Sequence, residues 1–322
     1  MKIKLKKIYG RKVVNIKIMH WMKKEDSGLA RSTLEFAKYE EKLGHQACIK
    51  QPGEDDIIYG TSSDIDIHSI HSQLNINTYF DKKPKLMWMH GEPLSSVGNG
   101  VSMKAIVDLA PLCDAFICMR RDEELIWSTI KKTYRVTKGI DLEVYKPIEG
   151  ITEKLSGEPS VLYCENWRSQ RNPLYLCVAM QEVWKKFPKA RLHLYNCNDK
   201  RMYETFMALY KNNKWFPFLR SVQQKTNDIN LLYNRVDMVV SCLHPLYARS
   251  IEAFGAGKAF IGPGYKEYDY PYQCDLDPIS MRDAIIKCWE EYGKIDFRKW
   301  AIEHHNVEDT VKESLAIYSR YL

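Results

Sequence analysis

The chain has 322 residues, of which 45% are hydrophobic and 28% are charged, and 48 Lys and Arg against 41 Asp and Glu give a formal net charge of +7. This composition excludes a largely disordered chain, because it supplies the apolar side chains of a buried core, and the length favours two domains. Nine cysteines without paired spacing argue against a disulfide scaffold or a zinc module and indicate a reducing, cytoplasmic location.

The amino-terminal segment is basic and only weakly apolar. Every Asp and Glu lies at or beyond Glu25, so the residues before it carry only positive charge, which suits either a solvated terminus or contact with a polyanion or membrane surface. The apolar stretch from 13 to 22 is interrupted by Asn15, Lys17 and His20, which argues against a signal peptide or a transmembrane segment.

Short apolar runs alternate with segments of helical period, first in one half of the chain and then again in the other. In the first half an amphipathic helix is predicted over 29–44, and strands are predicted over 13–20, 45–50, 65–70, 85–90, 114–119 and 134–137. In the second half strands are predicted over 160–164, 191–195, 237–242 and 259–262, with helices over 173–187, 228–234, 248–256, 278–292 and 307–321. The alternation predicts an α/β protein with two Rossmann-like, doubly wound domains that face a central cleft and meet near residue 148.

Candidate functional residues are expected just after strands, because ligands of open α/β sheets bind outside the carboxyl ends of the strands. Four segments meet this condition, at 20–28, 90–93, 166–171 and 244–250. They contain the candidates His20, Gly28, His90, Glu92, Asn166, Arg168, Arg171, His244, Tyr247, Ala248, Arg249 and Ser250.

The segment from His244 to Lys258 passes from a strand end into a helix that carries Glu252 about one turn in. The first amides of such a helix can hold a diphosphate, and a carboxylate at this distance can accept two hydrogen bonds from a ribose diol. A glutamate in a first helical turn can equally be a surface residue that offsets the helix dipole.

This segment resembles the signature of the retaining GT-B glycosyltransferases of the family-four, glycogen-synthase-like group, in which two glutamates separated by seven residues precede a small-residue stretch ending in Gly-Lys or Gly-Thr. Three further segments are similar to motifs of that family in the same order. They are Ser27-Gly28-Leu29-Ala30 with Leu43-Gly44-His45, then Lys138-Gly139-Ile140-Asp141, and then residues 228–241. The resemblance implies a GT-B fold with an acceptor-side domain over 1–148, a nucleotide-sugar-binding domain over 149–305, and a last helix, 306–322, packed back on the first domain.

The chain departs from the family pattern at two places. His244 stands where the family has its first glutamate, near the donor sugar, so the identity of the sugar does not carry over. Where the family has Arg-x4-Lys for the diphosphate, Arg171 matches the Lys and Asn166 matches the Arg, with Arg168 two residues later. Guanidinium groups suit bidentate phosphate contacts, so Arg168 and Arg171 are either a diphosphate clamp or exposed loop residues.

The resemblance implies transfer of a glycosyl group from a nucleotide diphosphate sugar to an acceptor hydroxyl, with retention at the anomeric carbon and with no metal or other cofactor. It assigns His90, Arg168, Arg171 and Glu252 to catalysis and His20 and Glu92 to the acceptor side. It assigns Gly28, Asn166, Asn196, His244, Tyr247, Ala248, Arg249, Ser250 and Glu252 to donor binding.

Two Asp-x-Asp triplets, at 64–66 and 275–277, are about as frequent as chance allows, and His68 and His71 lack a third ligand at metal-site spacing, so neither predicts a metal centre. The acceptor stays open between a glycan, a lipid-linked or small-molecule hydroxyl, and DNA. A glycosyltransferase of modified DNA bases is one alternative, which the compact length and the basic amino terminus suit. A nucleotide-sugar epimerase and an inactive GT-B binding scaffold are the others.

Overall fold

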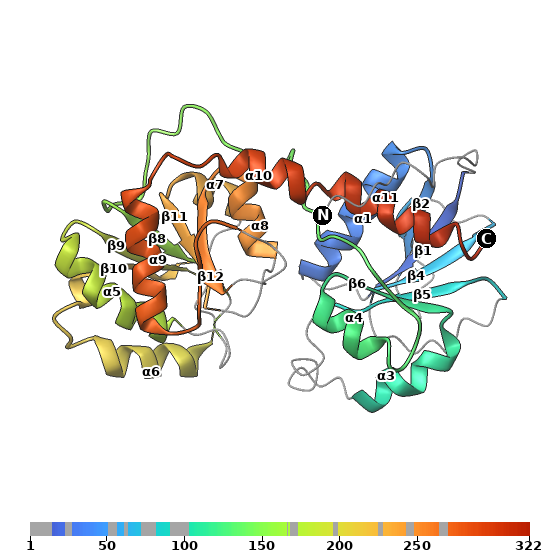
Figure 1. Ribbon diagram of the computed structural model, residues 1–322, viewed down its shortest axis with the longest axis horizontal. Helices are drawn as coiled ribbons and strands as arrows, with labels where there is room; N and C mark the ends of the chain where they lie inside the picture. Colours follow the sequence, from blue (N-terminus) through green and yellow to red (C-terminus); the bar gives the residue numbers. More distant parts are fainter. Residues whose placement is uncertain are drawn as a thin grey trace. The chain divides into compact units, whose positions relative to one another are not determined.

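The computed structural model describes residues 15–22, 28–50, 57–60, 64–71, 82–90, 103–165, 167, 173–195, 199–224, 228–242, 248–263 and 270–322. The chain divides into two compact α/β units. The boundaries between them lie between Asp141 and Leu142 and between His304 and His305. The first unit holds the chain up to Asp141 together with the last residues, and the second holds the chain between (Figure 1). The sequence places these boundaries after residues 148 and 305.

The first unit is built on a seven-stranded sheet with the order β3-β2-β1-β4-β5-β6-β7. All its neighbouring strands are parallel except the edge pair β2 and β3. The strands are β1 (Lys17–Trp21), β2 (Gln46–Lys50), β3 (Ile57–Tyr59), β4 (Ile67–Ile70), β5 (Lys85–Trp88), β6 (Ala115–Cys118) and β7 (Thr133–Arg135). The direction of winding reverses between β1 and β4, which is where a doubly wound sheet offers a ligand crevice.

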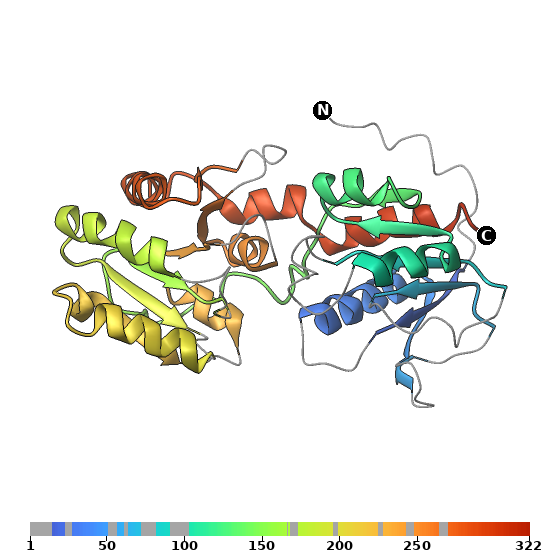
Figure 2. The ribbon, with the colours of Figure 1, turned by 90° about the horizontal axis from the view of Figure 1, so that it is seen from below.

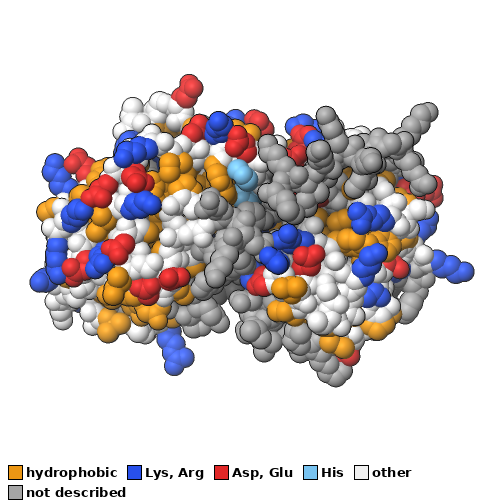
Figure 3. Space-filling model, in the orientation of Figure 1, with side chains coloured by type: hydrophobic (Ala, Val, Ile, Leu, Met, Phe, Trp, Pro, Cys, Tyr) orange, Lys and Arg blue, Asp and Glu red, His pale blue; other side chains and the backbone are white. Residues whose placement is uncertain are grey.

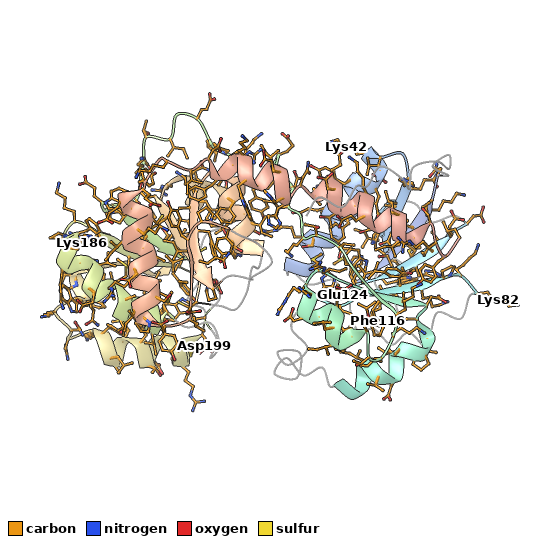
Figure 4. The ribbon with its side chains drawn as sticks, viewed as in Figure 1. Lys42, Lys82, Phe116, Glu124, Lys186 and Asp199 are labelled. Atoms are coloured by element: carbon orange, nitrogen blue, oxygen red, sulfur yellow. The ribbon has the colours of Figure 1, made fainter. Side chains whose placement is uncertain are left out.

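Helices cover both faces of this sheet (Figure 1 and Figure 2). Side chains alternate between the two faces of a strand, so Ile18 packs with α1 (Gly28–Lys42) and α11 (Val307–Tyr318), whereas Met19 packs with α3 (Met103–Leu109) and α4 (Arg121–Trp127). Phe116, labelled in Figure 4, belongs to the second face, and its ring meets Trp127 of α4 edge-on at 6.3 Å between centroids.

The last helix, α11, is held to the first unit by the segment that follows β7. Ile140 forms a parallel bridge to Asn306, and the backbone of Gly139 passes so close to α11 that an added Cβ would lie 2.5 Å from the amide nitrogen of Val307. Glycine is therefore needed at 139 for the close approach of two backbones.

The second unit is built on a six-stranded parallel sheet with the order β10-β9-β8-β11-β12-β13. Its strands are β8 (Ser160–Tyr163), β9 (Arg191–Tyr195), β10 (Leu219–Gln224), β11 (Met238–Val240), β12 (Ala259–Pro263) and β13 (Gln273–Cys274). Its helices are α5 (Leu174–Lys186), α6 (Lys200–Tyr210), α7 (Ile229–Asn234), α8 (Ala248–Gly255), α9 (Pro278–Glu290) and α10 (Phe297–His304). Helix α5 lies against α9, and α8 lies against α7 and α10. The doubly wound α/β prediction is thereby confirmed for both halves of the chain.

The described surface of the second unit mixes charges of both signs in the view of Figure 3. The eight cysteines among the described residues are all buried free thiols. In the part of the chain that the structure describes, no helix has the length and apolar character needed to span a bilayer.

Candidate active site

In the second unit, polar side chains gather where the winding direction reverses, at the carboxyl ends of β8 and β11. Glu165 follows β8 and Ser241 follows β11, and the Ser241 hydroxyl donates a hydrogen bond to Oε1 of Glu165. Both side chains are buried, so the hydrogen bond ties the two central strands of the sheet together at the edge where a ligand would bind.

Glu252 lies on α8, which starts at Ala248, and is only 5% exposed. Its Oε2 accepts a hydrogen bond from the Tyr233 hydroxyl at 3.0 Å and another from Nη1 of Arg249 at 3.2 Å. Both of these donors bond to the same oxygen, Oε2. The carboxylate is fixed through one oxygen and keeps the other for a further donor.

The surroundings of Glu252 keep its neighbours in defined charge states. Burial raises the pKa of the Cys164 thiol to about 12 and raises the pKa of the Tyr233 hydroxyl well above its ordinary value. Burial lowers the pKa of the Arg249 guanidinium, but the attraction of nearby acidic groups, of which Glu252 is the charged one, outweighs it, so the pKa is raised. Tyr233 therefore acts as a neutral donor and Arg249 as a fixed positive charge beside the carboxylate.

In the first unit, an unbroken chain of side chains runs from α1 to the end of β5. Nε2 of His20 lies 2.6 Å from Oε2 of Glu40, and Nδ1 of His20 lies 2.8 Å from Nε2 of His71. Nδ1 of His71 in turn lies 3.2 Å from Nε2 of His90. Glu40, His20 and His71 are buried, and only His90 is half-buried, so the chain leads from the interior of the unit toward its ligand-binding edge.

A second polar group supports His71 from the side. The Ser69 hydroxyl lies 3.0 Å from Nε2 of His71 and 3.0 Å from the Tyr318 hydroxyl of α11, and it accepts a hydrogen bond from the indole Nε1 of Trp88. The rings of His71 and His90 each stack on Trp88, with centroids 5.3 and 5.9 Å from it. These contacts fix the planes of both imidazole rings.

Burial also determines the charge of His71 and His90. It lowers the pKa of His71 well below its ordinary value, and the positive charge on His20 and His90 when they are protonated adds to the effect. Burial, with the repulsion of Lys138, lowers the pKa of His90 to about 3. Both rings are therefore neutral near pH 7, and each carries one N–H and one bare nitrogen.

The structure assigns several of the predicted residues to local clusters within each unit. Arg249 and Glu252 lie together on α8 with Ala248 at its start, and Ser250 is buried on the same helix. Gly28 begins α1, the element that follows β1 in the chain. Seven predicted residues lie outside the described ranges, namely Glu92, Asn166, Arg168, Arg171, Asn196, His244 and Tyr247.

His20 differs from its expected place beside an acceptor. It is 0% exposed, and both of its ring nitrogens are engaged by protein groups, so it lies behind His71 and His90 instead of facing a ligand. His20 is the fourth residue of β1, and its side chain points to the face covered by α1 and α11 because it shares the strand parity of Ile18.

Glu40, His71, Glu165 and Tyr233 are among the residues of these clusters that sequence reasoning did not single out for a ligand-binding role. His71 and Glu165 follow strands, so the rule that selected His20 and His90 also applies to them. Glu40 stands four residues after Phe36 on an amphipathic helix, which places a carboxylate on the apolar face. No local pattern predicts that Tyr233, which lies 19 residues before Glu252, would reach that carboxylate.

Among the described residues, no group of three or more His, Cys, Asp or Glu is arranged to hold a metal ion. The two Asp-x-Asp triplets are structural where they are described. Asp66 accepts a hydrogen bond from the amide of Lys17, and Asp277 caps the amino terminus of α9.

Comparison with solved structures identifies the fold. A glycosyltransferase from Rickettsia africae aligns with a TM-score of 0.73 at 17% sequence identity, over 95% of this chain and 98% of that one. HepE from Anabaena, in complex with UDP, aligns with a TM-score of 0.72 at 13% identity, over 95% and 100% of the two chains. The catalytic domain of starch synthase IV from Arabidopsis thaliana, bound to ADP and acarbose, aligns with a TM-score of 0.65 at 10% identity, over 96% and 99%.

The fold is that of the GT-B glycosyltransferases, as the sequence predicts. No family model and no curated protein sequence matches this chain. Similarity at these levels of identity establishes the fold, and the activity has to be argued from the site.

Proposed function

We propose that the protein is a retaining glycosyltransferase that moves a sugar from a nucleotide diphosphate sugar to an acceptor hydroxyl and needs no metal. The observation that carries this proposal is Glu252, a buried carboxylate on α8 held through Oε2 by Tyr233 and Arg249. A ribose diol needs an oxygen acceptor of this kind at a fixed distance from a helix amino terminus.

The second unit supplies the donor side of the proposal. The amides at the start of α8 and the positive end of its dipole suit a diphosphate, whose charge grows as the bond to the sugar breaks. We assign Arg168 and Arg171, which follow β8, to the same diphosphate, and His244 and Tyr247 to the segment before α8. Asn166 and Asn196 complete the proposed donor contacts.

Solved proteins of the same fold support a nucleotide donor. HepE from Anabaena has been solved with UDP, with UDP-glucose, and with UDP and glucose, and the starch synthase has been solved with ADP. Retention and independence from metal rest on the resemblance to the family-four enzymes. In that reaction the departing diphosphate accepts the proton of the acceptor hydroxyl, so no pair of carboxylates at glycosidase spacing is needed.

The first unit supplies the acceptor side. His90 ends the histidine chain at the carboxyl edge of the sheet, and as a neutral imidazole it can exchange a hydrogen bond with a sugar hydroxyl. We assign Gly28, at the start of α1, to the neighbourhood of the phosphates and Glu92 to the acceptor. The acceptor is a hydroxyl of a glycan, of a lipid-linked sugar or of a small molecule.

The test is a thermal-shift screen of UDP-, GDP-, ADP- and dTDP-sugars, followed by assays of donor hydrolysis and transfer with each donor that stabilises the protein. Glu252→Ala is expected to weaken donor binding by about 2 to 4 kcal/mol, the worth of a pair of hydrogen bonds to a charged group. Glu252→Gln preserves the size of the side chain while removing its charge and one of its two acceptor oxygens. Glu303→Gln, an exposed glutamate of α10 in the same unit, is the control.

Failure of every nucleotide sugar to raise the melting temperature would contradict the proposal and favour a binding scaffold. Conversion of free donor without any acceptor would indicate an epimerase. Labelled sugar on duplex DNA carrying modified bases, lost as salt rises, would identify DNA as the acceptor.

A further inference from the structure

The hydrogen-bonded chain of side chains Glu40–His20–His71–His90 couples the hydrogen positions of its members, which no single residue could do. A hydrogen bond between ring nitrogens joins each histidine to the next. The position of the hydrogen on one ring therefore dictates its position on the following ring. A neutral imidazole has one donor and one acceptor nitrogen, which leaves the chain two consistent arrangements.

In the first arrangement His20 is neutral. Its Nε2–H donates to the Glu40 carboxylate, which can only accept, so the bare Nδ1 of His20 must accept from Nε2–H of His71. The bare Nδ1 of His71 then accepts from Nε2–H of His90. His90 presents a bare Nδ1, which is a hydrogen-bond acceptor.

In the second arrangement His20 carries one more proton and pairs with Glu40 as a cation. Its Nδ1–H now donates to Nε2 of His71, Nδ1–H of His71 donates to Nε2 of His90, and His90 presents Nδ1–H, which is a donor. One proton entering at Nδ1 of His90 and two shifts along the hydrogen bonds, from His90 to His71 and from His71 to His20, convert the first arrangement into the second. No other bond changes, and the positive charge ends beside Glu40.

The Ser69 hydroxyl is compatible with both arrangements. Its oxygen accepts from Trp88, whose indole N–H can only donate, and its own hydrogen can be given to the Tyr318 hydroxyl or to Nε2 of His71. The oxygen can therefore face a donating or an accepting Nε2 of His71 without leaving a buried polar atom unpaired.

We propose that Glu40, His20 and His71 are positioning residues that couple one buried proton to the hydrogen-bonding polarity of His90, so that the protonation of His20 sets whether Nδ1 of His90 accepts or donates. The role of His90 toward a sugar hydroxyl rests on the proposed function, whereas the coupling itself is a property of the first unit. Reversing the polarity of a contact exchanges a hydrogen bond for a clash of two donors or two acceptors, which is a strong means of selecting one ligand geometry.

The charged and titratable groups around the chain come from five parts of the first unit. They are Glu40 of α1 with His45 nearby, Tyr318 of α11, His20 of β1, His71 after β4, and Lys138, which acts on His90 and lies near Glu123. Of these, Glu40 is the group in direct contact with His20 that favours its charged form, and Lys138 opposes a charge on His90. The extra proton is thereby directed to the buried end of the chain.

The experiment is two-bond ¹H–¹⁵N correlation NMR of the full chain with ¹⁵N-labelled histidine, which reports the hydrogen-bearing nitrogen of each ring, across a pH titration. The proposal predicts that His71 and His90, wherever both rings are neutral, carry their hydrogens on nitrogens of the same name, both on Nε2 or both on Nδ1. Where they change, they change together with the protonation of His20. One ring with Nε2–H and the other with Nδ1–H, or a change in His90 alone, overturns the proposal.

Glu40→Gln removes the negative charge in contact with Nε2 of His20, so the midpoint of the joint change is expected to move to lower pH than in the native protein. Glu41→Gln is the matched control, because Glu41 is the next residue of α1, is exposed, and bonds to Tyr59 instead. His71→Asn breaks the chain, and the polarity of His90 should then no longer follow His20. An unmoved midpoint in Glu40→Gln, or continued coupling in His71→Asn, contradicts the proposal.

These measurements use the protein without any substrate, so their outcome does not depend on the proposed transferase activity. If transfer is found, Glu40→Gln is expected to shift the pH profile of kcat/KM and to leave the affinity for the free nucleotide unchanged, because the proposed nucleotide contacts, Gly28 apart, are assigned to the second unit. Equal losses in both quantities at every pH would indicate a merely structural role.

Discussion

Replacing Tyr233 with Phe removes a single oxygen from the second unit and tests whether Glu252 is held in place through Oε2. The Tyr233 ring is 0% exposed, and its hydroxyl donates to Oε2 of Glu252 at 3.0 Å, so the substitution keeps the packing and deletes one hydrogen bond to a carboxylate. Arg249 continues to donate to the same oxygen, at 3.2 Å. The substitution should therefore lower the unfolding free energy of the second unit by about 1.5 kcal/mol, the low end of the range for a hydrogen bond to a charged group.

The same substitution should loosen the carboxylate that we assign to the ribose, so donor affinity is expected to fall by up to about tenfold. The assay is urea denaturation followed by isothermal titration with the donor nucleotide. The two units can unfold separately, so the transition is followed with probes in each.

Tyr292→Phe is a matched control for Tyr233→Phe. The Tyr292 hydroxyl also faces a carboxylate, Oδ1 of Asp237, but at 3.4 Å and from a side chain that is 48% exposed, so its loss should change stability by less than about 0.5 kcal/mol. If Tyr233→Phe matches this control in both stability and affinity, the hydroxyl does not orient Glu252 and the reasoning is refuted.

Three further substitutions test other parts of the structure. Gly139→Ala forces a Cβ to 2.5 Å from the amide nitrogen of Val307 and should destabilise the docking of α11 by about 1 to 3 kcal/mol, measured as faster hydrogen exchange in that helix. Arg298→Lys should cost about 2 to 4 kcal/mol in urea denaturation, because this guanidinium donates to three backbone carbonyls and an ammonium group cannot span them. Burial raises the pKa of Glu123 to about 8 from an ordinary 4.5 despite nearby Arg120, so the folded chain holds a proton that the unfolded chain lacks between these values. Stability should therefore fall as pH rises from 5 to 8, and the fall should be smaller in Glu123→Gln in a pH series of thermal melts.

The fold was predictable from the sequence because the alternation of strand and helix patterns occurs in both halves of the chain, with loop segments between the elements. Short elements such as β3, β13 and α4 gave too few residues for a periodic signal. Their places are set by pairing with longer strands and by packing on the sheet, as the contact of Phe116 with Trp127 illustrates.

The site was predictable only in part. Glu252 and its neighbour Arg249 stand on one helix, so a linear motif contains both. The contacts of Tyr233 with Glu252 and of Glu40 with His20 join elements that are distant in sequence, and only the sheet order brings them together. His71 lacks metal-site spacing and was set aside for that reason. Its position after a strand nevertheless indicates a site residue as strongly as the position of His90 does.

The central claim is that Oε1 of Glu252 binds the ribose of a donor nucleotide. It is tested most directly by isothermal titration of the preferred nucleoside diphosphate and of its 2′,3′-dideoxy analogue into the native protein and into Glu252→Ala. The native protein should bind the ribose form about tenfold or more tightly than the analogue, and Glu252→Ala should bind the two alike. An equal preference for the ribose form in both proteins would contradict the claim.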